Sequence, residues 1–267
     1  MRILPVFFAA LALVAKPLAA QTPPAPISPT QKIVLFDGKN FDNFYTWLVD
    51  NKLEDPKHVF TVRDGMLRVS GEEWGALTTK RTYRDYHLVV EWRWAGPNLG
   101  ARAGHARDSG ILVHGIGEDG AYQGTWLESI ESQIIEGGPG DFILIVGKGH
   151  PTMTANVHEL AGQPYWDEKG APKTMDRGRF NWFGRDPKWT DTLGYRGPND
   201  VEKPLGEWNR QEVICDGDTI TNIVNGVVVN KGYRVTPTAG KIQLQSEGAE
   251  IWFRRVELLP LDKRQGR

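Results

Sequence analysis

Two polar side chains that could do chemistry, Glu131 and Gln133, lie two residues apart in a segment rich in apolar residues. Ile130 and Ile134 alternate with them, so in a strand the isoleucines would face the core and the polar pair the opposite side. A carboxylate can take up or give a proton, and an amide can hold a hydroxyl group by hydrogen bonds. The spacing therefore predicts a polar patch on one face of a sheet.

Two further segments show the same alternation. In residues 87–94, Glu91 and Arg93 share the face opposite the apolar residues, and in residues 241–247 Gln245 does the same. If these strands are neighbours in a curved sheet, their polar face forms a concavity in which carboxylates and amides can bind vicinal hydroxyl groups. The same alternation also occurs on any solvated sheet face, which is the alternative interpretation.

Short apolar runs separated by Gly, Asp and Asn fill most of the chain, and helix signals are nearly absent. The clearest turn signals are Asp64-Gly65 and Asn225-Gly226, which are typical of two-residue hairpin loops. About a dozen strands are expected, a number that suits two packed sheets better than a single barrel. The sequence therefore predicts an all-β, two-sheet antiparallel sandwich.

Residues 1–20 have the composition of a signal peptide. Arg2 supplies a positive charge, an apolar run follows from Ile3 to Val14, and small residues end the segment. Residues 21–31 are rich in proline and predict an extended linker, so a single folded domain is expected over residues 32–262. We therefore expect an exported protein, periplasmic or extracellular, with no membrane span; a short N-terminal anchor is the alternative.

Residues 159–207 lack a clear hydrophobic period and are rich in Gly, Pro, Trp and charged residues. A loop of this length inside a compact domain is usually functional or disordered. The aromatic residues from Trp166 to Trp189 favour an ordered loop that covers a groove. Within it, Trp182 is a candidate for stacking on a ligand.

Composition excludes several classes of function. The formal net charge is −1 and no run of Lys or Arg occurs, so neither a nucleic-acid surface nor a polybasic membrane patch is expected. The one cysteine, Cys215, rules out an internal disulfide and suits a small buried residue. No glycine-rich phosphate loop or dinucleotide fingerprint is present, so no nucleotide cofactor is expected.

Histidines are the remaining candidates for metal ligands. The spacing of His105, His114, His150 and His158 is irregular and matches no zinc motif. His114 is the best candidate among them, but it shares a strand face with Leu112, which favours a buried histidine instead. A divalent metal is left open as the one candidate cofactor.

Six motifs occur in order along the chain: LFDGKNFDNFYTWL at 35–48, DYHLVVEWRW at 85–94, DSGI at 108–111, ESQI at 131–134, GEWN at 206–209 and GKIQLQSEGAEIWFRRVEL at 240–258. This ordered set resembles the exported bacterial family of 3-keto-disaccharide hydrolases, also described as 3-keto-glycoside-cleaving enzymes. Each motif alone is weakly specific, whereas the set covers nearly the whole mature chain. Asp108 and Arg255 stand where the family commonly has Asn, which bears on the substrate more than on the fold.

The resemblance implies a concanavalin A-like jelly-roll sandwich with a carbohydrate site on its concave face. It also implies cleavage of a sugar already oxidised at C3, in which a base removes the C2 proton, the C1 aglycone leaves and water adds back. Glu131 is the first choice for the base, and Glu91 for hydrogen bonding or acid catalysis. The candidate substrate-binding residues are Arg93, Gln133, Gln245, Asp108 and Trp182.

Two other functions fit the same residues. The groove of a carbohydrate-binding module would hold a glycan without cleaving it, as many folds of this kind do. Conventional hydrolysis of unoxidised glycans by two carboxylates is the third interpretation. It ranks last because Gln133 stands in ESIESQIIE where the strand motif of glucanases would carry an acid.

Overall fold

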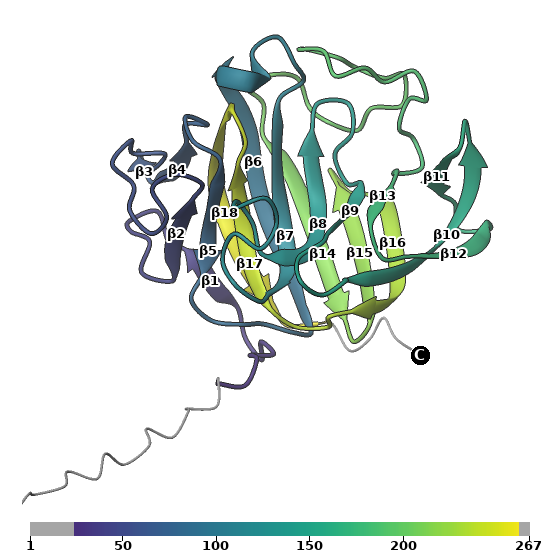
Figure 1. Ribbon diagram of the computed structural model, residues 1–267, viewed down its shortest axis with the longest axis horizontal. Helices are drawn as coiled ribbons and strands as arrows, with labels where there is room; N and C mark the ends of the chain where they lie inside the picture. The colour runs from purple at the N-terminus through teal and green to yellow at the C-terminus, as the bar shows by residue number, and fades with distance from the viewer. Residues whose placement is uncertain (1–23, 262–267) are drawn as a thin grey trace, which may run out of the picture.

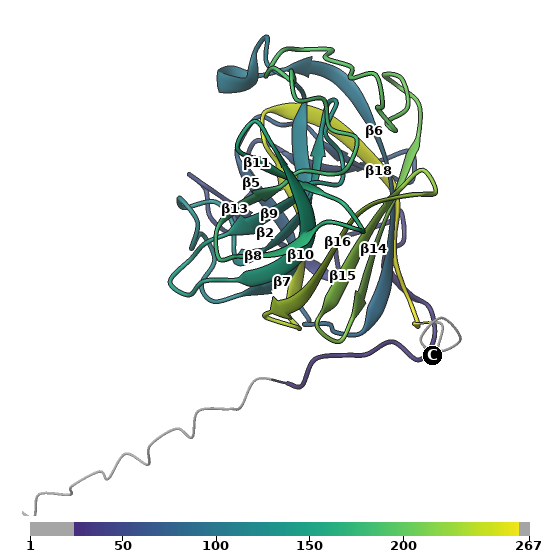
Figure 2. The same ribbon diagram turned by 90° about the vertical axis from the view of Figure 1, so that its right-hand side faces the viewer.

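The computed structural model describes residues 24–261, which form eighteen β-strands and one short 3₁₀ helix, η1 (Gly100–Arg102). The strands make two antiparallel sheets, of eleven and seven strands, that pack face to face (Figures 1 and 2). Within this part of the chain, no helix has the length and apolar character needed to cross a membrane. The predicted all-β, two-sheet antiparallel sandwich is confirmed.

The eleven-stranded sheet has β6 near its middle. Its main path runs in the order β11 (Gln163–Trp166), β10 (Thr152–Leu160), β16 (Val227–Thr236), β15 (Thr219–Val224), β14 (Asn209–Asp216), β6 (Tyr86–Asn98), β18 (Ala249–Leu259), β4 (Met66–Val69) and β3 (Phe60–Arg63). Two strands lie off this path: β1 (Ile33–Phe36) pairs with β18, and β12 (Ala171–Met175) pairs with β10.

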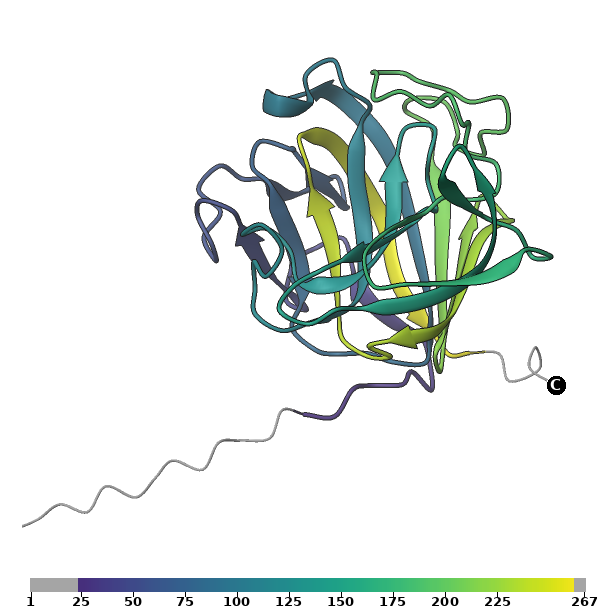
Figure 3. The same cartoon turned by 45° about the vertical axis from the view of Figure 1, so that its right-hand side comes forward.

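The seven-stranded sheet brings together strands from distant parts of the chain. Its order is β13 (Gly178–Phe180), β9 (Phe142–Ile145), β8 (Glu128–Ile135), β7 (Asp108–Ile116), β17 (Lys241–Ser246), β5 (Gly75–Thr79) and β2 (Phe44–Leu48). Figure 3 shows the same two layers from an oblique direction. The order places β7 between β8 and β17, so side chains from these three strands can meet on one face.

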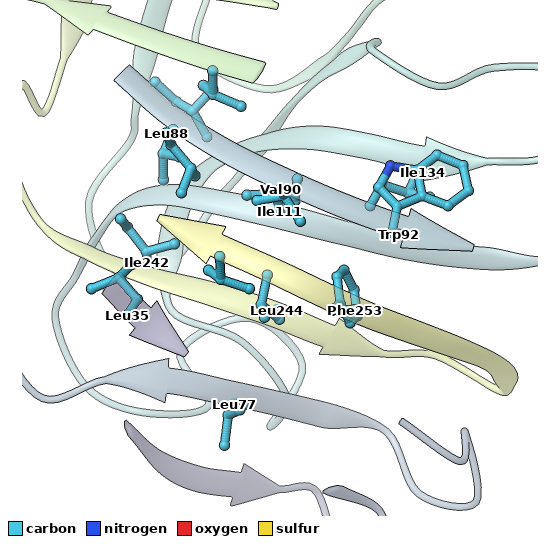
Figure 4. Close-up of a cluster of buried hydrophobic side chains, with 14 of the residues drawn as sticks. Leu35, Leu77, Leu88, Val90, Trp92, Ile111, Ile134, Ile242, Leu244 and Phe253 are labelled. Atoms are coloured by element: carbon cyan, nitrogen blue, oxygen red, sulfur yellow. The ribbon is translucent and has the colours of Figure 1, made fainter. Parts of the chain in front are cut away.

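The hydrophobic core lies between the two sheets. Leu88 and Trp92 of β6 share one buried cluster with Ile111 of β7 and Leu244 of β17 (Figure 4). Trp92 also meets Trp94 edge-on, with their ring centroids 5.3 Å apart. Burial of these apolar side chains is the main source of stability. The inward faces predicted for residues 87–94 and 241–247 are confirmed.

Both predicted hairpin turns are present. Asp64 and Gly65 connect β3 to β4 with φ angles of 52° and 73°. Asn225 and Gly226 connect β15 to β16 with φ angles of 50° and 84°. Two successive positive φ angles define the type I′ turn, whose twist matches that of the flanking strands and which favours Asn-Gly and Asp-Gly.

The predicted signal peptide, residues 1–20, lies outside the described residues, as does the beginning of the predicted linker. The described part of that linker is not free of the domain. Ile27 donates its N–H to the carbonyl of Thr82 at 2.9 Å and accepts a hydrogen bond from Arg84 N–H at 3.0 Å. Backbone pairing therefore begins earlier in the chain than Lys32, because Ile27 can pair with an exposed segment ahead of β6.

The segment 159–207 is not one loop. Its first half forms β11, β12 and β13, which are edge strands with many exposed residues. Exposed edge strands show weak hydrophobic alternation, so the pattern did not reveal them. The irregular second half runs along one end of both sheets, where Trp189 Nε1 donates to the carbonyl of Glu136 at 2.8 Å (Figure 1).

Glu202 fastens this irregular part to the sandwich. Its Oε1 accepts the Trp94 Nε1–H at 2.7 Å, and its Oε2 accepts the Gly137 N–H at 3.2 Å. Burial, together with the nearby charge of Asp200, raises the pKa of Glu202 to about 8. Because the folded chain holds this proton more tightly than the unfolded chain, the contribution to stability is full at acid pH and is lost as pH rises through 8.

We expect Glu202→Gln to flatten the pH dependence of stability between pH 5 and pH 9. The wild-type free energy of unfolding should fall over this range relative to the variant, by roughly 1.4 kcal/mol for each unit by which the pKa is raised. Urea unfolding across the range measures this difference. Glu207→Gln, at an exposed position in the same segment, is the control. Parallel curves for wild type and Glu202→Gln would contradict the prediction.

Candidate active site

The face of the seven-stranded sheet that points away from the core, here called the site face, carries a cluster of polar side chains. Gln133 of β8 pairs with Gly110 of β7, and Glu131 pairs with Leu112. On the other side of β7, Leu244 pairs with Ile111, which sets Gln245 beside Gly110. Directly paired residues point to the same face of a sheet. The structure thus brings Glu131, Gln133 and Gln245 together.

Gly110 leaves the space in which two of these side chains meet. A Cβ atom at Gly110 would lie 2.1 Å from Glu131 Oε1 and 2.6 Å from Gln245 Oε1, both far inside contact distance. The two side chains therefore lean over β7 from opposite sides, above a residue that has no side chain. Any other residue at position 110 would push them apart.

Asp108 extends the cluster toward one end of β7. Its Oδ1 accepts a hydrogen bond from Gln133 Nε2 at 3.0 Å, and its Oδ2 lies 3.1 Å from Arg102 Nη2. Arg102 in turn contacts Asp191 of the irregular segment at 3.2 Å. The structure therefore joins Asp108 to the predicted site residues, and it supplies a cation to hold the carboxylate.

Glu247 is a third carboxyl group of the cluster. It follows β17 directly, and the register that pairs Leu244 with Ile111 continues to place Glu247 opposite Asp108. Part of its surface is exposed, whereas Glu131 and Asp108 are buried. Strand alternation in residues 241–247 puts Glu247 on the same face as Gln245, but Glu247 was not among the predicted site residues.

Crowding and burial raise the pKa values of all three carboxyl groups. Burial raises the pKa of Glu131 well above its ordinary value, and the charge of Asp108 adds to the effect. Burial raises the pKa of Asp108 to about 7, against the lowering influence of Arg102. Burial and both neighbouring carboxylates raise the pKa of Glu247. Near neutral pH the cluster therefore holds fewer negative charges than carboxyl groups, so an acid and a base stand side by side.

Arg179 of β13 brings a positive charge to the other side of the cluster. Ile143 of β9 pairs with Glu131 on one side and with Arg179 on the other, so both side chains point to the site face. Arg179 Nη1 donates to Asp141 Oδ2 at 2.7 Å, and its charge lowers the pKa of Glu131. Asp141 also pairs with Arg185. No sequence pattern pointed to Arg179, because its strand is three residues long.

Unpaired amide groups point to a ligand. Among the described residues, Gln245 Oε1 and Gln133 Oε1 are buried without a protein hydrogen-bond partner, and the Gln245 amide has only the Glu131 carboxyl group beside it. Gln245 is fully buried, and leaving a buried amide unpaired costs roughly 1–3 kcal/mol. A hydroxyl-bearing or carbonyl-bearing ligand above Gly110 would supply the missing partners.

Aromatic side chains form the neighbouring part of the site face. Trp74 stacks on Trp126 with ring centroids 6.0 Å apart, and Tyr122 stacks on Trp126 at 5.8 Å. Trp126 Nε1 donates to the carbonyl of Gly75 at 3.0 Å, which fixes the stack on β5. Trp74 and Tyr122 each keep part of a ring exposed, so a flat apolar surface lies beside the polar cluster.

The predicted sharing of one groove by Glu91, Arg93 and Glu131 is wrong. Glu91 and Arg93 lie on β6, on the outer face of the eleven-stranded sheet. Glu91 pairs there with Arg254 at 2.6 Å, and the Arg93 guanidinium lies 4.8 Å from the ring centroid of Trp208. Strand alternation correctly assigns these side chains to a face away from the core, but it does not say to which sheet the strand belongs.

Trp182 is not available for stacking on a ligand, so that prediction is also wrong. Its side chain is fully buried and packs in a small cluster with Val224 and Val229. Its backbone N–H donates to Asp141 Oδ1 at 2.7 Å, which holds the residue against the buried Asp141.

His114 is buried in the protein interior. Its Nδ1 lies 2.8 Å from the carbonyl of Pro237, and its ring meets Tyr86 edge-on with centroids 6.0 Å apart. Burial lowers the pKa of His114 to about 4, so the ring is neutral over the physiological range. The residues from 24 to 261 contain no group of three or more His, Cys, Asp or Glu side chains arranged to hold a metal ion.

Comparisons with known proteins match this architecture. The family model described as a 3-keto-alpha-glucoside-1,2-lyase-like domain matches residues 31–259. A candidate glycosyl hydrolase from Parabacteroides distasonis ATCC 8503 superposes with a TM-score of 0.52 at 17% identity, covering 87% of this chain and 94% of that one. A second protein from the same organism has a TM-score of 0.49 at 20% identity, covering 87% of this chain and 100% of that one.

The β-glucanase of Bacillus licheniformis aligns at 10% identity with a TM-score of 0.43, over 86% of this chain and 97% of that one. A comparison with curated proteins gives no match. The likeness to the first Parabacteroides distasonis protein shows the fold alone, which in this chain is an antiparallel two-sheet β-sandwich.

The space over Gly110 can be tested by a double-mutant cycle. We expect Gly110→Ala to destabilise the protein by about 1–3 kcal/mol, the usual cost of overpacking, because the new methyl group meets Glu131 Oε1. The same substitution in a Glu131→Ala background should cost clearly less, since that contact is gone. Urea unfolding measures both costs. An equal cost in the two backgrounds would show that Glu131 does not lie over Gly110.

Proposed function

We propose, since this chain belongs to the 3-keto-alpha-glucoside-1,2-lyase-like family, that it cleaves glycosides whose sugar carries a ketone at C3. Family membership supports a carbohydrate-active protein. The observation that carries the finer assignment is the cluster of Glu131, Asp108 and Glu247, whose raised pKa values leave acid and base forms together beside an unpaired amide.

The C3 ketone makes the proton at C2 acidic. A base removes that proton, and the electron pair of the broken C2–H bond forms an enediolate between C2 and C3. When the C3 carbonyl re-forms, a C1=C2 double bond is made, the bond from C1 to the leaving oxygen breaks, and that oxygen takes a proton from an acid. Water can then add across the double bond, with its hydroxyl at C1 and its proton at C2.

Glu131 is suited to the role of base. A carboxylate with a raised pKa takes a proton more readily than an ordinary one. The Gln245 amide and the Arg179 guanidinium both act on Glu131 and could donate hydrogen bonds to the developing enediolate oxygen. Donors that are already in place when charge develops supply much of the rate enhancement in such sites.

Glu247, not Glu91, is suited to the role of acid. Glu91 is on the outer face of the other sheet and cannot reach a ligand held over Gly110. Asp108 is engaged by Arg102 and by the Gln133 amide, both of which favour its carboxylate form. Glu247 has no such partner among the described residues, and the charge of Asp108 favours its protonated form. It is also the partly exposed member, which suits proton delivery to a leaving group.

Variants of the two carboxyl groups test these roles. We expect Glu131→Gln to lower kcat/KM on a 3-keto-glucoside by about 10²–10⁴-fold, the usual effect of losing a general base. Glu247→Gln should impair substrates with a poor leaving group more than those with a good one, because only the former need the acid. Release of the aglycone from 3-keto and unoxidised glucosides is the measurement.

Glu91→Gln is the matched control and should leave kcat/KM within about threefold, since surface ion pairs contribute little. Full turnover by both Glu131→Gln and Glu247→Gln would refute the assigned roles. Tight binding of unmodified oligosaccharide without product, even after long incubation, would instead favour a binding module.

The pH profile gives an independent test through Arg179. The Glu131 pKa lies above its ordinary value, so kcat/KM should rise with pH on an acidic limb well above pH 4.5. Removing the Arg179 charge in Arg179→Gln should move that limb to higher pH, because the charge lowers the pKa of Glu131. An unchanged limb would show that Arg179 does not act on the base.

A further inference from the structure

A hollow of about 240 Å³ lies between the turn before β5 and the loop after β6. Its walls include Trp74 and Glu72 from the turn before β5, and Leu99 and Gly100 from the loop after β6. We call this hollow the Trp74 pocket. It is smaller than the ~300–1,000 Å³ typical of drug-sized ligands, so it suits a single ring. A larger hollow of about 480 Å³ is lined by residues 24–26, 80–82 and 239–241, at the opposite end of β17 from Glu247.

The Trp74 pocket adjoins Glu247. Ser246 pairs with Gly75, and continuing that antiparallel register places Glu247 opposite Trp74. The turn that carries Glu247 is bonded to both walls. Ser246 Oγ donates to the carbonyl of Glu73 at 2.7 Å, and Leu99 N–H donates to the carbonyl of Gly248 at 2.6 Å. A group in the pocket is therefore next to the residue that we assign as the acid.

The pocket combines a flat aromatic wall with acidic side chains. The partly exposed ring of Trp74 is held in place by its stack on Trp126. Asp50, Glu72 and Glu73 all contribute to the lining, and no Lys or Arg does. Glu73 is engaged by the backbone N–H groups of Asp50 and Asn51 and by Lys57, whereas Glu72 is exposed. The lining thus leaves excess negative charge facing the pocket.

We propose that the Trp74 pocket receives the leaving group of the substrate and selects a neutral or cationic ring over an anionic one. This inference rests on the proposed function. Sugar rings and aromatic rings both present flat apolar surfaces that suit an indole face. An anionic ring, such as a uronate, would meet the carboxylates of the lining and be repelled by like charge.

Three 3-keto-disaccharides that differ in the leaving sugar alone test the charge preference. With glucose, glucosamine and glucuronate as leaving sugars, we expect kcat/KM to be at least about tenfold lower for glucuronate than for glucose at low salt, with a smaller gap at high salt. Glu72→Lys should narrow the gap by about tenfold or reverse it. Glu168→Lys, at an exposed position on the turn between β11 and β12, is the control and should leave the gap unchanged.

Two substrates whose leaving groups differ in size test whether Trp74 contacts the leaving group. Trp74→Ala should raise KM about tenfold for the glucose-bearing substrate and leave KM for methyl 3-keto-glucoside within about threefold, because a methyl group does not fill the pocket. Trp74→Phe, which keeps an aromatic face, should restore most of the loss and shows that the effect is not misfolding.

The outcomes separate the two proposals. If no substrate in the series releases its leaving group, the proposed function fails. The pocket inference fails, while the proposed function stands, if all three disaccharides are cleaved equally well. In that case Glu72→Lys would leave their relative kcat/KM values unchanged, and Trp74→Ala would leave KM for the glucose-bearing substrate unchanged.

Discussion

The site depends on the crowding of three carboxyl groups around one end of β7, where Gly110 leaves the space for one of them. Glu131 and Gln245 reach over β7 only because Gly110 has no side chain. Asp108 lies close enough to oppose the ionisation of Glu131, and both of these carboxyl groups oppose the ionisation of Glu247. In a buried setting such groups share protons, because several adjacent negative charges cannot be held at once. The sandwich serves this arrangement by placing β7 between two strands from distant parts of the chain.

Irregular segments supply positive charges that offset the negative charge of the carboxyl cluster. Arg102, in the short helix after β6, contacts Asp108 and also Asp191, so it links the site to the segment that runs along the end of the sheets. Arg179 and Arg185 meet on buried Asp141, which holds positive charge at the opposite side. Removing one partner of a buried pair of this kind is strongly unfavourable. The loops therefore set the electrostatic environment that the sheet alone does not provide.

The sequence predicts the faces of strands well and their partners poorly. Alternation correctly predicted that Trp92 faces the core and that Glu131 faces away from it, because the period of two is a local property of the strand. It could not show that Glu91 lies in the other sheet, since strand order is set by long-range pairing. Trp182 was misjudged for a related reason: a tryptophan in a loop stacks on a ligand or fills a core depending on contacts made elsewhere in the chain.

The shared protons of the cluster can be measured directly by carbon-13 NMR of the side-chain carboxyl groups, with Glu131→Gln, Asp108→Asn and Glu247→Gln used to assign the signals. We expect that at least one of the three still holds a proton at pH 6 and that an apparent pKa of about 7 or higher belongs to the cluster. Titration of all three groups near the ordinary values of about 4, for Asp and Glu alike, would contradict this expectation.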